Sequence, residues 1–238
     1  MNNIGIGIMC FGDEYYFKHT QDKISNLEKW GFDCHVLTDC PEKLVTNKEL
    51  GYPNIKIIKH NRHLGSYHDK IILVKKILEC NDICILIDAD VLVNDYSIFE
   101  DLMQYNFENG ISYVESLLGH RIKKEYVKHI QMNPNDIDWV EYKTYLQKIY
   151  PQYGDLETIY EYFLVFNKDG LKDDFYLNYE KLQVIKESCD IISGRKKVIG
   201  SGEGISIHVS AKISNSQIQR DNDLYELIKN KIENLNRK

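Results

Sequence analysis

The sequence predicts an α/β fold, in which a mixed, mostly parallel sheet is flanked by helices. Short apolar runs alternate along the chain with longer stretches whose apolar residues recur at helical spacing. The run over residues 83–87 contains no polar residue, which is typical of a strand that helices cover on both faces. Up to that run the predicted order is strand, helix, strand, strand, helix, strand, which is the order of a doubly wound sheet.

The elements of the first half follow from local patterns. Residues 4–10 alternate branched residues with glycine and predict a strand, and Gly12 permits a tight turn after it. Apolar residues at helical spacing predict a helix from Tyr16 to Trp30, which Gly31 ends. The other expected elements are strands over 32–37 and 55–58, a helix over 67–78 with Ser66 as N-cap, the strand over 83–87, a helix over 98–105 and a strand over 110–114.

The second half is less regular. We expect helical pieces around 123–131 and 139–150, a buried strand over 162–166, a helix over 175–189, a flexible glycine-rich loop over 200–204 and a terminal amphipathic helix over 221–238. The apolar face of the terminal helix comprises Leu224, Leu227, Ile228, Ile232 and Leu235.

Length and composition restrict the function classes. The 238 residues suffice for one large or two small domains, and the net charge of −6 argues against a nucleic-acid-binding surface, which is normally basic. No apolar run approaches the roughly 20 residues that span a bilayer, and the first residues lack the basic start of a signal peptide. The six cysteines show no paired metal-ligand spacing, so we expect reduced thiols in a cytoplasmic protein.

Two carboxylates follow the strand over 83–87, and only Ala89 separates Asp88 from Asp90. Side chains at i and i+2 of an extended chain point the same way, so these two converge just past the strand end, where open α/β sheets bind their ligands. Carboxylates this close repel unless a cation or a proton lies between them. The pattern predicts that Asp88 and Asp90 bind Mg²⁺ or Mn²⁺ against a phosphorylated substrate. The alternative is a strand end followed by a solvated turn.

The order of these pieces resembles the GT-A class of glycosyltransferases, which use nucleotide-sugar donors and carry an Asp-x-Asp metal motif, here Asp88-Ala89-Asp90. The resemblance covers roughly residues 4–115. It implies a single GT-A-like, Rossmann-type sheet and a transferase of the hexosyltransferase type, with Mn²⁺ or Mg²⁺ as cofactor and a UDP-sugar as donor. The nucleoside is expected between the loop that holds Phe11, Gly12 and Tyr16 and the strand end at Thr38 and Asp39.

Basic residues are expected near the diphosphate, because fixed positive charge stabilises the negative charge that develops on it as it leaves. Arg62 and Lys70 are the candidates in the first half, and Lys70 lies where galactosyltransferase-like members keep a basic residue over the donor. In the second half, His208 and Lys212 resemble the retaining branch, which implies His208 as third metal ligand and Lys212 on the diphosphate. For each of these cations the alternative is a solvated surface residue.

Three carboxylates, Asp155, Glu157 and Glu161, precede the strand predicted over 162–166. A carboxylate there can bind sugar hydroxyls, act as general base on the acceptor or stabilise an oxocarbenium-like transition state. We predict Glu161, nearest the strand, as catalytic, and Asp155 as the second candidate. The alternative is that Glu157 and Glu161 form an i,i+4 pair on an exposed helix, and Glu203 in the glycine-rich loop is a further candidate.

The predicted function is therefore metal-dependent transfer of a sugar from a nucleotide-sugar to a glycan or lipid-linked acceptor at the cell surface. We expect a nucleotide-sugar-binding half over 1–115, an acceptor-binding half over 116–220, and packing or homodimer formation through 221–238 in preference to weak membrane-surface association. Two alternatives stay open: a sugar-1-phosphate nucleotidyltransferase and a non-catalytic nucleotide-binding module. A P-loop and a Gly-x-Gly-x-x-Gly fingerprint are missing, which argues against a kinase or a dehydrogenase.

Overall fold

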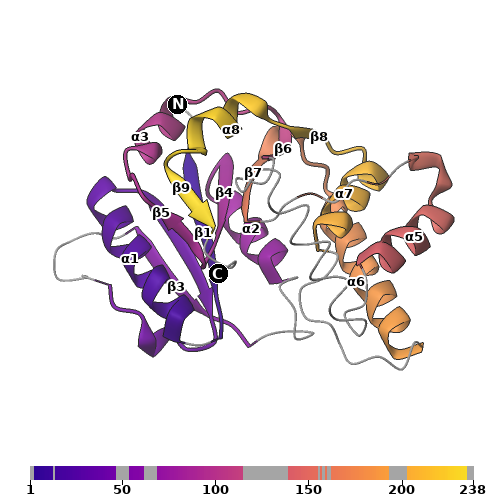
Figure 1. Cartoon of the computed structure of the whole chain (residues 1–238), viewed down its shortest axis with the longest axis horizontal. Helices are drawn as coiled ribbons and strands as arrows, with labels where there is room; N and C mark the ends of the chain where they lie inside the picture. The colour runs from indigo at the N-terminus through magenta and orange to yellow at the C-terminus, as the bar shows by residue number, and fades with distance from the viewer. Residues whose placement is uncertain are drawn as a thin grey trace.

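The computed structural model describes residues 3–12, 14–46, 54–61, 69–114, 139–154, 156, 159, 162–192 and 203–234. Its strands are β1 (Ile4–Cys10), β2 (Asp33–Thr38), β3 (Ile55–Lys59), β4 (Ile83–Asp88), β5 (Val91–Val93), β6 (Gly110–Tyr113), β7 (Phe163–Asn167), β8 (Ile218–Arg220) and β9 (Ile232–Asn234). Seven of them form one sheet in the order β3-β2-β1-β4-β7-β6-β8 (Figure 1). Only β7 is antiparallel to its neighbours, β4 and β6, so the predicted mixed, mostly parallel sheet is confirmed.

Helices cover both faces of this sheet. One face packs against α1 (Glu14–Trp30), α3 (Ile98–Gln104) and α8 (Asn222–Ile228). The other face packs against α2 (Lys70–Leu78), α6 (Asp174–Ile192) and α7 (Glu203–Ser214). A third, smaller apolar cluster joins α5 (Trp139–Ile149) to α6 and α7, and these three helices gather at one end of the molecule in Figure 1. Short 3₁₀ helices occupy Pro41–Lys43, Pro151–Tyr153 and Lys168–Gly170.

The glycine alternation of β1 explains how closely α2 lies on the sheet. Ile6 and Ile8 are fully buried on the face that α1 covers. Gly5 points to the opposite face, where a Cβ atom added to it would lie 2.5 Å from the Cγ2 atom of Ile77 in α2. The missing side chain therefore lets α2 pack directly on the backbone of the central strand.

Most of the predicted helices and strands are present in the structure, with bounds that differ by a few residues from the predicted ones. The helix expected over 67–78 is α2, which begins at Lys70 with Asp69 at the N-cap, whereas Ser66 lies outside the described residues. The helix predicted around 123–131 also lies outside them. Strand β7 comes from the second half of the chain but lies between β4 and β6, so the two predicted halves contribute to one sheet.

In the described part of the chain, no helix is long and apolar enough to cross a membrane.

Two local predictions are wrong. Glu203 and Gly204, expected in a flexible loop, begin α7. Helix α7 is buried on nearly all sides, so its sequence lacks the polar face by which a helix is recognised. The predicted terminal helix ends at Ile228 as α8, and Ile232 belongs to β9, which pairs with β5. This pairing with a distant strand overrides the helical spacing of the apolar residues.

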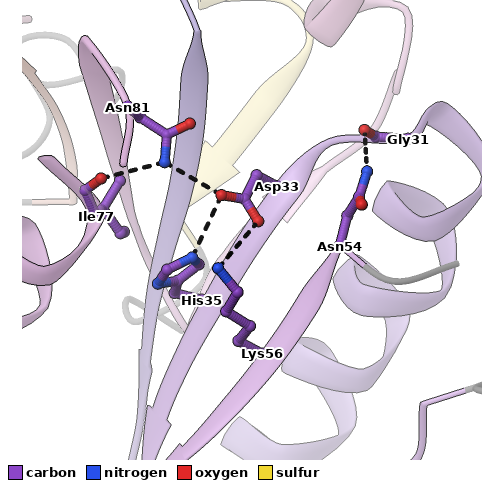
Figure 2. Close-up of polar contacts among 7 residues, drawn as sticks. All are labelled: Gly31, Asp33, His35, Asn54, Lys56, Ile77 and Asn81. Carbon is purple, nitrogen blue, oxygen red and sulfur yellow. Dashed lines mark hydrogen bonds and ion pairs between the residues drawn. The ribbon is translucent and has the colours of Figure 1, made fainter. Parts of the chain in front are cut away.

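A polar cluster ties the strands together at their amino-terminal edge (Figure 2). The Asn81 amide donates to the Asp33 carboxylate at 3.1 Å and to the Ile77 carbonyl at 3.1 Å. The same carboxylate lies 3.4 Å from His35 Nε2 and 3.9 Å from Lys56 Nζ. These contacts join β2 to β3 and to the turn before β4.

Candidate metal and nucleotide site

The carboxyl ends of four parallel strands meet at one edge of the sheet. In the strand register, Met9 of β1 lies beside Asp88 of β4, and Cys10 lies beside Thr38 of β2. Thr38 lies in turn beside Lys59 of β3. The segments predicted to hold the nucleoside, which follow β1 and β2, therefore emerge at the same edge as the Asp88-Ala89-Asp90 motif.

Asp88, the last residue of β4, forms an ion pair with the first residue of α2. The distance from Asp88 Oδ1 to Lys70 Nζ is 2.6 Å. The Lys70 side chain is only 4% exposed, whereas that of Asp88 is 24% exposed. Lys70 is thus not a solvated surface cation, and α2 places its charge beside Asp88.

Asp90 is a buried carboxylate with an incomplete set of hydrogen bonds. It is 3% exposed, and Asp90 Oδ2 has no hydrogen-bond partner among the described residues. Burial, followed by the charge of Asp88, raises the pKa of Asp90 to about 6. The negative charge of this pair is therefore costly, and a cation bound between the two carboxylates would relieve the cost.

Lys23 of α1 lies beneath the motif, and our sequence analysis did not select it. Its ammonium donates to the Ala89 carbonyl at 2.7 Å and to the His19 carbonyl at 3.3 Å, and the residue is 2% exposed. Burial lowers the pKa of Lys23 to about 8, and the nearby charge of Asp90 is the largest opposing effect. The available signal was its place in the buried stripe of α1, three residues after Thr20 and four before Leu27.

His60 is a second residue that our sequence analysis missed. It follows β3, its backbone N–H donates to the Thr38 carbonyl at 2.8 Å, and its Nε2 atom lies 3.2 Å from Asp69 Oδ2. Its ring meets that of Phe11 edge to face, with centroids 6.4 Å apart. Asp69 precedes Lys70, so four ionisable groups follow one another along this edge: His60, Asp69, Lys70 and Asp88.

The predicted nucleoside residues differ in accessibility. Asp39 and Gly12 are exposed and Tyr16 is half-buried. Gly12 adopts a φ of 113°, a conformation that favours glycine and turns the chain from β1 toward α1. Thr38 is fully buried and its Oγ1 accepts from the Cys40 N–H at 3.2 Å, so its side chain shapes the loop.

The donor set suits a hard divalent ion that keeps part of its coordination for other ligands. Asp88 and Asp90 supply carboxylate oxygens, which Mg²⁺ and Mn²⁺ prefer, and Asp90 Oδ2 has no competing donor among the described residues. No group of three His, Cys, Asp or Glu side chains in the described part of the chain could hold a metal ion. Two carboxylates, with water and phosphate oxygens as the other ligands, fit such an ion.

The remaining candidates lie on α7 or outside the described residues. His208 and Lys212 lie on α7, where His208 is buried and Lys212 is exposed. The structure thus does not form the predicted cluster of His208 with Asp88 and Asp90 among the described residues. Arg62, Asp155, Glu157 and Glu161 lie outside the described residues.

No protein-family model and no curated protein sequence matches the chain. Among solved structures, it is similar to the galactosyltransferase LgtC in complex with donor and acceptor sugar analogues, at 14% identity and a TM-score of 0.49, over 91% of this chain and 72% of that one. It is also similar to mouse xyloside xylosyltransferase 1, at 10% identity and a TM-score of 0.47, over 98% of both chains. A third is the mannosyltransferase of Pyrobaculum calidifontis in complex with GDP-mannose and Mn²⁺, at 10% identity and a TM-score of 0.46, over 94% of this chain and 55% of that one.

Proposed function

We propose that this chain is a metal-dependent glycosyltransferase that moves a sugar from a nucleotide-sugar donor to a glycan or lipid-linked acceptor. The observation that carries the proposal is Asp90, a buried carboxylate beside Asp88 whose Oδ2 has no hydrogen-bond partner among the described residues. Because Asp90 Oδ2 accepts no hydrogen bond from the described residues, this buried carboxylate keeps an oxygen available to a cation, and carboxylate oxygens are the ligands that Mg²⁺ and Mn²⁺ prefer. The carboxyl edge of an α/β sheet is also where nucleotides bind.

Each residue of the site has a role in this proposal. Asp88 and Asp90 would hold Mn²⁺ or Mg²⁺, which when bound supplies Lewis-acid neutralisation of the leaving diphosphate. Lys70, held beside Asp88, contributes fixed positive charge at the same place without reorganisation. The exposed Asp39 and the Gly12 turn lie at the same sheet edge and are proposed to face the nucleoside, with UDP as the first nucleotide to test.

Thermal unfolding in the presence of nucleotides tests this function against its alternatives. A glycosyltransferase should be stabilised by UDP with Mn²⁺, and Asp88→Asn and Asp90→Asn should each abolish that shift, whereas Asp173→Asn, at an exposed carboxylate, should retain it. Stabilisation by a nucleoside triphosphate in place of UDP would indicate a nucleotidyltransferase. No response to a panel of nucleotides with Mn²⁺ would contradict both enzymes.

The catalytic carboxylate is proposed to be Glu161, with Asp155 as the second candidate. Glu161→Gln keeps size and hydrogen bonding but removes the charge, so transfer or donor hydrolysis should fall by roughly 10²–10⁴-fold. Donor and metal binding should persist. Full activity in Glu161→Gln together with loss of activity in Asp155→Asn would assign the role to Asp155.

A further inference from the structure

We propose that Lys23 is a positioning residue, whose buried ammonium fixes the Ala89 peptide so that Asp88 and Asp90 are held in place for the metal. The proposal rests on the proposed function, because it concerns the same two carboxylates. The proposal gives helix α1 a role in the metal site, although neither of the two carboxylates of the site belongs to this helix.

The contact that carries the proposal joins positions 66 residues apart. Lys23 Nζ donates to the carbonyl oxygen of Ala89 at 2.7 Å, and this hydrogen bond is buried. That oxygen belongs to the peptide that leads into Asp90. Because a peptide group is planar, fixing its oxygen also fixes the direction in which the Asp90 residue begins.

Packing alone does not explain an ammonium at this position. Lys23 is 2% exposed, and an apolar residue of similar length would fill the same space without the cost of burying a charge. The donors of Lys23 are directed at backbone carbonyls, those of Ala89 and His19. The ammonium therefore acts on the backbone of the motif, while its charge also offsets the two carboxylates nearby.

Lys23 could affect metal binding through its hydrogen bond to the Ala89 carbonyl or through its positive charge. Substituting Lys23 distinguishes these two effects, because they change the metal affinity in opposite directions. Lys23→Met removes both the donor and the positive charge. Loss of a nearby positive charge by itself favours a bound cation. Weaker Mn²⁺ binding in Lys23→Met would therefore report the lost hydrogen bond and not the lost charge.

The experiment measures Mn²⁺ binding by electron paramagnetic resonance of the free ion, with Mn²⁺ alone and with Mn²⁺ plus UDP. We expect about tenfold weaker binding in Lys23→Met, the size of a lost charge-assisted hydrogen bond, and recovery in Lys23→Arg, which keeps donor and charge. Lys18→Met makes the same chemical change at an exposed position of α1 and should bind Mn²⁺ like the parent. Should Lys23→Met not fold, Lys23→Leu, which also lacks the donor and the charge, replaces it with the same expectation.

The outcomes distinguish this inference from the proposed function. Unchanged or tighter binding in Lys23→Met, together with loss of binding in Asp90→Asn, would overturn the positioning role and leave the metal site intact. An equal loss of Mn²⁺ affinity in Lys23→Met and Lys23→Arg would also overturn the positioning role. It would show that the shape of the lysine side chain matters and its hydrogen bond does not. Equal Mn²⁺ binding by the parent and Asp90→Asn would overturn both the inference and the proposed function.

Discussion

Lys23, Lys70 and Asp90 are almost completely buried ionisable residues, and all three surround one turn of the chain. Buried charges cost stability unless they compensate one another. Here the two ammonium groups oppose the carboxylates of Asp88 and Asp90, so the local charges balance before a metal binds. A divalent ion would make the turn positive, and the negative charge of a diphosphate would restore the balance.

Asp90→Asn should change stability and metal binding in opposite directions. In the metal-free protein at pH 7 the amide avoids burying a negative charge, and the difference between a pKa of 3.8 and one of about 6 corresponds to at most about 3 kcal/mol. Because the pKa is raised on folding, this gain should shrink as the pH falls from 7 toward 4, where the Asp90 carboxyl is protonated in the folded parent. Urea unfolding measures the gain, and Mn²⁺ should no longer stabilise the variant. A variant that is less stable than the metal-free parent would contradict the buried-charge argument.

Some residues of the candidate site could be selected from the sequence because each belongs to a short local pattern. Asp88 and Asp90 follow an uninterrupted apolar run, and Lys70 opens the helix before it. Lys23 was not predictable in the same way, because its importance depends on a contact with Ala89 that only the packing of α1 on the sheet creates. A lysine in an apolar stripe was the one available signal.

Among the elements, the segment that follows β8 illustrates how tertiary pairing limits prediction. Strands β1, β4 and β7 were predicted because their apolar runs suit a buried strand on their own. Residues 232–234 become a strand only because β5 offers an unpaired edge. Further contacts hold this segment: Lys231 Nζ pairs with Asp101, and the Asn94 N–H donates to the Lys231 carbonyl at 2.8 Å.

Ile232→Ala should therefore destabilise the protein, although the residue lies near the end of the sequence. Ile232 is 3% exposed and belongs to the same apolar cluster as Ala89 and Val91, so the cavity should cost about 2 kcal/mol or more. Urea unfolding measures this cost, and amide hydrogen exchange should show faster opening of β5. Lys229→Met is a control at an exposed position of the same segment, since the Lys229 side chain pairs with Glu226 at the surface and loss of that pair should cost less than about 0.5 kcal/mol. Similar small effects for both substitutions would show that β9 does not stabilise β5.

At the scale of the whole molecule, the carboxyl ends and the amino ends of the sheet strands carry different groups of polar residues. The carboxyl edge gathers the buried charges of the candidate site, whereas the amino edge holds the cluster of Asp33, His35 and Asn81 that joins strands to one another (Figure 2). We expect stability and metal binding to be separable, because substitutions at the amino edge act one strand length away from the motif.

His35 makes this separation measurable through pH. Burial lowers the pKa of His35, although the neighbouring Asp33 carboxylate opposes the shift. The unfolded chain then takes up a proton more readily than the folded chain, so the free energy of unfolding should fall as the pH is lowered below about 6.5. His35→Gln should reduce this dependence in urea unfolding between pH 5 and pH 8, and His19, whose pKa burial also lowers, should account for part of what remains. An unchanged pH dependence, or altered Mn²⁺ binding at pH 7, would contradict the assignment.

The pairing of β9 with β5 has a practical consequence for work with this protein. Asn234 lies opposite Val91, and Val91 is the residue after Asp90. The last residue of β9 therefore lies beside the residue that follows the carboxylates. A polyhistidine purification tag fused there would bring imidazole groups, which bind the same divalent ions, close to the motif. A tag placed before β1, which starts at the opposite edge of the sheet, keeps those ligands away from the ions whose binding is to be measured.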